Sequence, residues 1–294
     1  MMSQFLQFAA AEIQKSGDHF FSIAEIIGDG NPETLYLNPN NPCQDIYSVA
    51  KAYVVTAIGM CVDRGLLKVT DKVVDALGDD CPQSYHPYWA ETTVHHLLLH
   101  QIHIPCTLDI DCIDANTFTE DYLNFMMNLE CLSKPGGERR YTDGAFYMLA
   151  RIVEAKAKEP CDNFLWRELF FPLGYREVAW SHCPKGHVIG ATGLYLRVGD
   201  MAKLGAIYLN KGVYQERRYL SEEWVDTVLK NGYELRPVGI GDAYAKSGMK
   251  GQNLLVIPEA NRVVAWQAYI NGASKASLTK KAAQYRDEPS SSCP

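Results

Sequence analysis

The stretch Asp45-Ile46-Tyr47-Ser48-Val49-Ala50-Lys51 places a serine and a lysine three positions apart at the start of a long apolar segment. Apolar residues recur at offsets of three and four over residues 49–61, and Gly65 follows, which predicts a helix that ends near that glycine. On a helix, residues i and i+3 share one face, with their Cβ atoms about 5–6 Å apart. The lysine amine could therefore reach the serine hydroxyl and accept its proton.

This spacing makes Ser48 a candidate nucleophile and Lys51 its candidate base. A free serine hydroxyl is a poor nucleophile and needs an adjacent base. A lysine can act as that base when desolvation or neighbouring positive charge favours its neutral form. The apolar surroundings favour burial of both side chains. The alternative is an ordinary core helix that contains both residues without using them, because an SxxK pattern by itself also arises by chance.

The composition is that of an ordinary globular protein. Its 294 residues are 47% hydrophobic, enough for a large core in one domain or two lobes. The net charge of −7 and the lack of a long basic run argue against nucleic acid as a partner. No segment approaches the roughly 18 uninterrupted apolar residues of a membrane span. The first residues do not resemble an export signal. We therefore expect a cytoplasmic protein with no membrane partner.

The cysteines and histidines do not indicate a metal site. The nine cysteines are odd in number and form no CxxC pair, so we expect reduced thiols, although a Cys106–Cys112 bridge is an open alternative. His96 and His100 are spaced i, i+4, but no HExxH glutamate lies between them. We expect no metal and no cofactor. The cysteines are Cys43, Cys61, Cys81, Cys106, Cys112, Cys131, Cys161, Cys183 and Cys293.

Strand patterns occur at both ends of the chain. Two β-rich runs near the start are separated by a Gly- and Pro-containing turn, and two apolar runs near the end are separated by another turn, so each pair predicts an antiparallel hairpin. The middle of the chain is predicted to be mostly helical. The expected strands are 20–27, 34–37, 253–257 and 262–270. The expected helices are 3–14, 94–100, 119–129, 144–157, 199–210 and 221–230.

These elements predict an α+β fold: one antiparallel β-sheet, assembled from both chain ends and flanked by helices, with an inserted all-helical lobe. We expect a single domain over residues 1–294. Its α/β lobe would comprise about 1–72 and 236–294, and its helical lobe about 73–235. A cleft between the lobes is the expected site. Ser48 follows the first hairpin and would lie where this cleft opens.

A second candidate motif, Tyr141-Thr142-Asp143, follows a Pro-Gly-Gly turn and precedes a predicted helix. The Tyr141 phenol could relay a proton if a cation lies beside it. Asp143 could cap the helix or hold Lys51 through a charge-assisted hydrogen bond. Taken alone, the segment is more often a helix cap with a packed aromatic residue.

A third candidate motif, Lys246-Ser247-Gly248, lies just before the predicted strand 253–257. An edge strand there could pair with a substrate amide through its backbone. The backbone amides of Ser48 and Met249 could then bind one carbonyl oxygen as an oxyanion hole. The alternative is the ordinary beginning of a strand with a surface lysine.

Together, in this order, the three motifs resemble those of the penicillin-recognising serine hydrolase superfamily. SxxK corresponds to Ser48 and Lys51, a YxN-like motif to Tyr141 and Asp143, and a KTG-like motif to the segment that begins at Lys246. The resemblance covers nearly the whole chain and looks closest to the class C β-lactamase and esterase branch. The run Thr93-Val94-His95-His96-Leu97-Leu98-Leu99-His100 is also similar to the HLLTH segment of that superfamily.

The resemblance implies an acyl-enzyme mechanism without a cofactor. Ser48 would attack a small ester, amide or peptide, and Lys51 and Tyr141 would pass its proton to the leaving group. By the family's pattern, the residues that bind the substrate or its oxyanion would be Asp143, Lys246, Ser247, Gly248 and Met249.

One departure from the family pattern is Asp143, which replaces the usual asparagine. An ionised carboxylate can only accept hydrogen bonds, so we expect Asp143 to pair with Lys51 and keep that lysine protonated. The alternatives are a β-lactamase or D-alanyl-D-alanine carboxypeptidase activity, or a catalytically silent relative that binds a ligand in the same cleft. The sequence does not indicate an oligomeric state.

Overall fold

The computed structural model describes residues 2–38, 41–105 and 120–287. The Cys106–Cys112 bridge considered from the sequence lies outside these residues, as does the first residue of the predicted helix 119–129. The cysteines within the described ranges are free thiols. No helix in these ranges is both long enough and apolar enough to cross a bilayer.

A six-stranded antiparallel sheet joins the two ends of the chain, as the hairpin patterns predict. The strand order is β2-β1-β11-β10-β9-β8. At its centre β1 pairs with β11, from His19 opposite Tyr269 to Ile27 opposite Arg262, with one irregularity between Phe20 and Ser22. The strands are β1 (His19–Ile27), β2 (Glu33–Tyr36), β8 (Arg236–Pro237), β9 (Tyr244–Ser247), β10 (Asn253–Ile257) and β11 (Arg262–Tyr269).

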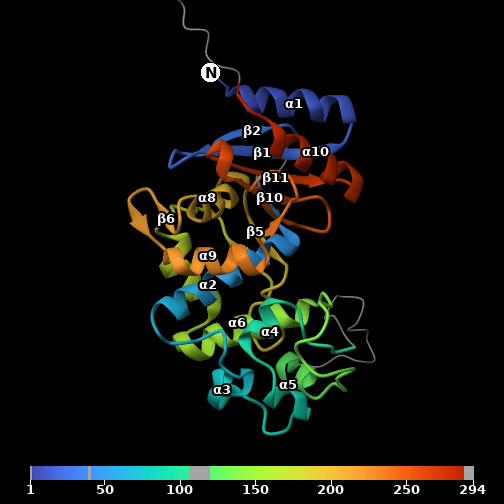
Figure 1. Ribbon diagram of the computed structural model, residues 1–294, viewed down its shortest axis with the longest axis vertical. Helices are drawn as coiled ribbons and strands as arrows, with labels where there is room; N and C mark the ends of the chain where they lie inside the picture. Colours follow the sequence, from blue (N-terminus) through green and yellow to red (C-terminus); the bar gives the residue numbers. More distant parts are fainter. Residues whose placement is uncertain (1, 39–40, 106–119, 288–294) are drawn as a thin grey trace, which may run out of the picture.

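Helices cover both faces of this sheet, which explains why its central strands are buried along nearly their whole length. Along β10, Leu254 and Val256 belong to the larger core, and Leu255 and Ile257 to a second core on the opposite face. Side chains alternate between faces along a strand, so a strand covered on both sides reads as a continuous apolar run. Figure 1 shows α8 (Val198–Leu209) on one side of the sheet, and α1 (Gln4–Ser16) and α10 (Gly272–Gln284) on the other. The predicted α+β class is confirmed.

The elements that the sequence did not predict include the terminal helix and a small three-stranded sheet. The terminal helix α10 buries few residues, mainly Leu278, Ala282 and Ala283, so its apolar periodicity is weak. A small sheet in the order β3-β5-β4 interrupts the mostly helical middle, and its strands are too short to give a clear alternation. They are β3 (Cys43–Asp45), β4 (Ala179–Trp180) and β5 (Leu194–Arg197).

Helix α2 (Ala50–Asp63) is buried on nearly all sides and packs against some of the helices of the middle segment. The predicted helix begins at residue 49, but Ser48 lies in a separate 3₁₀ turn, η1 (Tyr47–Val49), that leads into α2. The other main helices here are α3 (Val73–Leu77), α4 (Val94–Leu98), α5 (Tyr122–Met127), α6 (Asp143–Ala157) and α9 (Glu222–Asn231).

Helix α8 lies within the segment that the sequence assigns to the helical lobe, yet it packs on the sheet, against β1, β10 and β11. Gly205 allows this close approach, because a Cβ atom there would be 2.9 Å from Leu254 Cδ1 and closer still to Val263. The division of the chain into two lobes therefore stays a proposal, with residues 1–72 and 236–294 in one lobe and 73–235 in the other. The structure places α8, from the second range, on the sheet of the first.

Gly59, in the middle of α2, gives a testable packing prediction. A Cβ atom there would overlap the Trp224 indole of α9. Replacing a helical glycine with alanine normally stabilises a protein by about 0.5–1 kcal/mol, whereas overpacking costs about 1–3 kcal/mol. We expect Gly59→Ala to lower the free energy of unfolding by about 1–2 kcal/mol, measured by urea denaturation. The matched control is Gly272→Ala at the start of α10, where a Cβ atom meets nothing within 4 Å. Equal stability of the two variants would contradict the prediction.

Candidate active site

Ser48 lies directly after a residue with unusual backbone geometry. Tyr47 has φ of +48°, in the left-handed region that residues other than glycine seldom occupy. The Asp45 carboxylate accepts a hydrogen bond from the Tyr47 amide at 2.7 Å, and the Ile46 amide donates to the Leu194 carbonyl at 2.9 Å. These contacts hold the sharp turn between β3 and α2 at which Ser48 lies, partly exposed.

Lys51 is fully buried one helical turn after Ser48, as the spacing predicts. Its Nζ is 3.3 Å from Ser48 Oγ, 2.6 Å from Asp143 Oδ1 and 2.9 Å from the Ala191 carbonyl oxygen. An ammonium group has three hydrogens to donate, and these three acceptors match them. The arrangement is therefore that of a protonated lysine that orients the Ser48 oxygen.

Asp143 was predicted either to cap a helix or to bind Lys51, and it binds Lys51. The capping is done by Thr142, whose Oγ1 accepts from the Gly144 amide at 3.2 Å. The first turn of α6 thus supplies both its own cap and the counter-charge for the buried lysine.

Tyr141 completes the group around the serine, because its hydroxyl donates to Ser48 Oγ at 2.8 Å. Lys51 Nζ and Lys246 Nζ lie 4.7 and 5.4 Å from the centre of its ring. Burial raises the pKa of Tyr141 to about 12, although the charge of Lys246 opposes this rise. At neutral pH Tyr141 is therefore a neutral phenol that donates a hydrogen bond to Ser48.

The third motif reaches this group through β9. Gly248 passes so close to the strand leading to Ser48 that a Cβ atom on it would lie 2.9 Å from the Ile46 carbonyl oxygen. Lys246 is buried, and its ammonium forms an ion pair with the Glu234 carboxylate. The Ser247 hydroxyl instead donates to Asn253 Oδ1 at 2.6 Å, on the neighbouring strand. Lys246 therefore lies beside Tyr141, whereas the Ser247 hydroxyl is bonded to the neighbouring strand. The Met249 side chain is 70% exposed.

The predicted pairing of a substrate backbone with β9 requires a free strand edge, and part of β9 has one. On that side β8 pairs only with Tyr244 and Ala245. Beyond them, within the described part of the chain, no strand covers the edge at Lys246 and Ser247. An extended substrate backbone could hydrogen-bond there, beside Ser48.

Two further residues at the site, His100 and Glu234, were not predicted to lie there. The sequence suggested His100 as a candidate metal ligand and as the end of the HLLTH-like segment. In the structure its ring stacks on Tyr141, 4.6 Å between ring centres, and its Nε2 donates to Glu234 Oε1 at 2.9 Å. Glu234 is 134 positions away along the chain, and its single signal in the sequence is a charge within an otherwise ordinary segment. Among the described residues, no cluster of three or more His, Cys, Asp or Glu side chains could hold a metal ion.

Burial and neighbouring charges determine the protonation states of His100 and Glu234. Burial lowers the pKa of His100, which keeps its imidazole neutral, and Nδ1 can then accept from the Thr142 amide at 3.2 Å. Burial alone would raise the pKa of Glu234, but Lys246 and His100 hold it far below its usual range. Glu234 is therefore an ionised carboxylate behind Tyr141.

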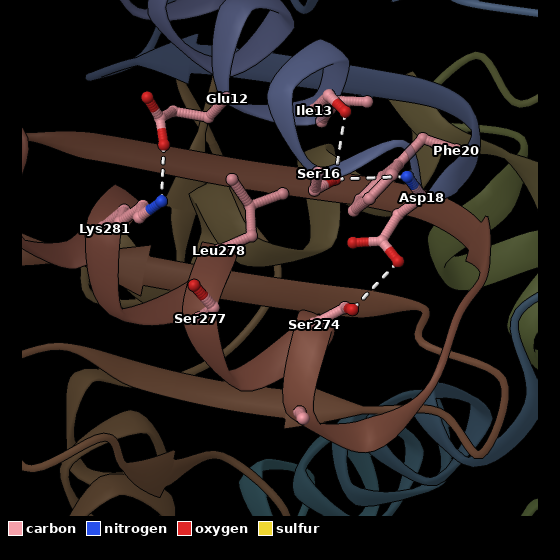
Figure 2. A pocket seen from close by; sticks show the side chains of 10 residues that line it. Glu12, Ile13, Ser16, Asp18, Phe20, Ser274, Ser277, Leu278 and Lys281 are labelled. Atoms are coloured by element: carbon pink, nitrogen blue, oxygen red, sulfur yellow. Dashed lines mark hydrogen bonds and ion pairs between the residues drawn. The ribbon is translucent and has the colours of Figure 1, made fainter.

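A separate cavity of about 270 Å³ lies between α1, α10 and β1 (Figure 2). The Glu12–Lys281 ion pair and the hydrogen bond from Ser274 to Asp18 lie at its rim. Its described lining includes no residue of the Ser48 group.

Comparison with known proteins gives one family and many similar folds. The family model described as Beta-lactamase matches residues 39–288. A penicillin-binding protein from Bacillus halodurans is 17% identical with a TM-score of 0.69, covering 96% of this chain and 99% of that one. A penicillin-binding protein homolog from Caulobacter crescentus is 13% identical with a TM-score of 0.72, covering 95% and 97%. EstCE1, described as a hydrolase with promiscuous acyltransferase activity, is 13% identical with a TM-score of 0.72, covering 95% and 98%. Identities this low show a shared fold alone, and no curated protein matches the sequence.

Proposed function

The chain belongs to the beta-lactamase family, whose members are generally serine hydrolases, and we propose that it forms an acyl-enzyme at Ser48 with a small ester, amide or peptide. The observation that carries this proposal is that the Ser48 oxygen accepts hydrogen bonds from two side chains. Ser48 Oγ is 2.8 Å from the Tyr141 hydroxyl and 3.3 Å from Lys51 Nζ. A serine oxygen that lies between a proton-transferring phenol and an orienting lysine, at a partly exposed turn, is in an arrangement that nucleophilic catalysis can use.

In the proposed reaction, Ser48 Oγ attacks the substrate carbonyl carbon and a tetrahedral oxyanion forms. For this step the Tyr141 hydroxyl turns to accept the Ser48 proton, and it passes its own hydrogen to the leaving alkoxide or amine as the bond to the carbonyl carbon breaks. Water then attacks the acyl-enzyme, gives its proton back along the same path, and releases the acid. Because Lys51 donates to Asp143 and Ala191, we assign the proton transfer to Tyr141 and the orientation of Ser48 to Lys51.

The proposed substrate site is the free edge of β9 with two backbone amides. A substrate carbonyl oxygen would accept hydrogen bonds from the amides of Ser48 and Met249, each such donor contributing about 3–4 kcal/mol to the transition state. Lys246 and Asp143 would border this position. The described activity of EstCE1, whose fold is similar, supports an acyl-transfer chemistry.

Two alternatives have their own supporting observations. Similar folds include penicillin-binding proteins, which favours a lactam- or peptide-directed activity of the β-lactamase or carboxypeptidase type. The close pairing of Lys51 with Asp143 favours a catalytically silent, ligand-binding relative, because a lysine held as ammonium cannot accept a proton.

Intact-protein mass spectrometry separates these functions. The wild-type protein is incubated with a fluorophosphonate and, separately, with a penicillin, and hydrolysis of a p-nitrophenyl ester is followed in parallel. We expect a single fluorophosphonate adduct and ester turnover. A penicillin adduct in addition would support the lactam-directed alternative. A folded protein that forms no adduct and turns over no ester would contradict the proposal and favour the silent relative.

A further inference from the structure

Glu234 has a backbone conformation that its side chain does not favour. It lies in the connection between α9 and β8, is 2% exposed, and has φ of +65°. Glycine adopts this left-handed region freely, and a glutamate there is disfavoured unless surrounding contacts hold it. Such outliers concentrate at functional sites. A need for the carboxylate, rather than for this backbone turn, therefore explains why a glutamate occupies the position.

The Glu234 carboxylate binds two groups that flank the Tyr141 ring. Its Oε1 accepts from His100 Nε2 at 2.9 Å, and its Oε2 forms the ion pair with Lys246. The His100 ring stacks on Tyr141 with an interplanar angle of 29°, and Lys246 Nζ lies 5.4 Å from the centre of the Tyr141 ring. A further cation, the Arg139 guanidinium, lies 3.8 Å from Glu234 Oε1 and 5.2 Å from the centre of the Tyr141 ring.

From this geometry we infer that Glu234 is a positioning residue: it holds His100 and Lys246 against Tyr141 and so fixes the phenol at Ser48. The inference rests on the proposed function, because it assigns Glu234 a role in that reaction. Glu234 does not touch Ser48 in the described hydrogen bonds, and it acts through its two partners. Misplacement of a catalytic group by about 1 Å can lower a rate by about a hundredfold.

The charge of Glu234 gives a readout that a purely structural residue would not affect. Its negative charge is one of the influences that raise the pKa of Tyr141. Replacing it with a neutral amide lowers that pKa, so the alkaline limb of the rate against pH, where the phenol loses its hydrogen, moves to lower pH. The charged and titratable groups that face Tyr141 are Lys51 from α2, His100, Arg139, Asp143 from α6, Lys246 from β9 and Glu234.

The experiment measures the fluorophosphonate labelling rate of the full chain from pH 6 to 12. We expect Glu234→Gln to lower the plateau rate by about tenfold or more and to move the alkaline limb to lower pH. Glu234→Gly relieves the backbone conflict, which offsets part of the cost of leaving the buried Lys246 ammonium unpaired, and it should share the slower rate and the shifted limb. This variant keeps the inference testable if the glutamine variant does not fold.

The matched control is Glu154→Gln. Glu154 is another buried carboxylate, which accepts from Arg151 Nε and from His187 Nδ1, each at 2.8 Å. We expect it to change stability but neither the labelling rate nor the limb. Wild-type rates in both Glu234 variants, or slower rates without a shift of the limb, would overturn the inference. A wild type that no probe labels would overturn the proposed function, and the inference with it.

Discussion

Replacing Ser48 with alanine is expected to abolish covalent labelling and to lower turnover by at least about a thousandfold. The change removes the atom that would bond to the substrate, whereas Lys51 keeps its contacts with Asp143 and Ala191. Ser48 is only partly buried, so we expect the free energy of unfolding to change by less than about 1 kcal/mol. Mass spectrometry of the labelled protein measures the first effect, and urea denaturation the second.

The control for this variant is Ser277→Ala, which removes the hydroxyl of an exposed serine on α10. It should keep the wild-type labelling rate and turnover. An adduct of unchanged stoichiometry on Ser48→Ala would mean that another side chain is the nucleophile. Retained turnover without an adduct would instead indicate direct attack by water.

The sheet and the three motifs could be predicted because their signals are local. Continuous apolar runs at 253–257 and 262–270 mark strands covered on both faces, and i, i+3 spacing brings Ser48 and Lys51 together. Asp143 was expected to pair with Lys51 from its chemistry alone, since a carboxylate beside a lysine can only accept. The 2.6 Å contact agrees with that expectation.

The remaining features depend on contacts between distant segments. Glu234 and His100 are 134 positions apart, and only the fold brings them behind Tyr141. Ser48 lies in a 3₁₀ turn instead of α2 because Tyr47 is held in a left-handed conformation by Asp45, which helical periodicity does not reveal. The Ser247 hydroxyl bonds to Asn253 because adjacent strand residues point to opposite faces, so the motif brings Lys246 to the site without its neighbour.

Lys51→Met is expected to lower both stability and activity strongly. Methionine has a similar length and no charge, so it removes the ammonium from Asp143 and leaves the space largely filled. Removing one partner of a buried ion pair typically costs about 3–5 kcal/mol, and we expect about 3 kcal/mol here because Asp143 is slightly exposed. Loss of the ammonium that orients the Ser48 oxygen should lower the labelling rate by about a hundredfold. Urea denaturation and the rate of fluorophosphonate labelling measure the two effects.

The double variant Lys51→Met with Asp143→Asn separates these two roles of the lysine. A neutral amide at 143 no longer requires a buried counter-charge, so the double variant should regain much of the lost stability. It should not regain activity, because the Ser48 oxygen still lacks the Lys51 donor that lies 3.3 Å from it. Recovery of both stability and labelling would show that Lys51 serves only to neutralise Asp143, and Tyr141 would then be sufficient to activate Ser48. Recovery of stability alone would separate the structural ion pair from the catalytic contact within one side chain.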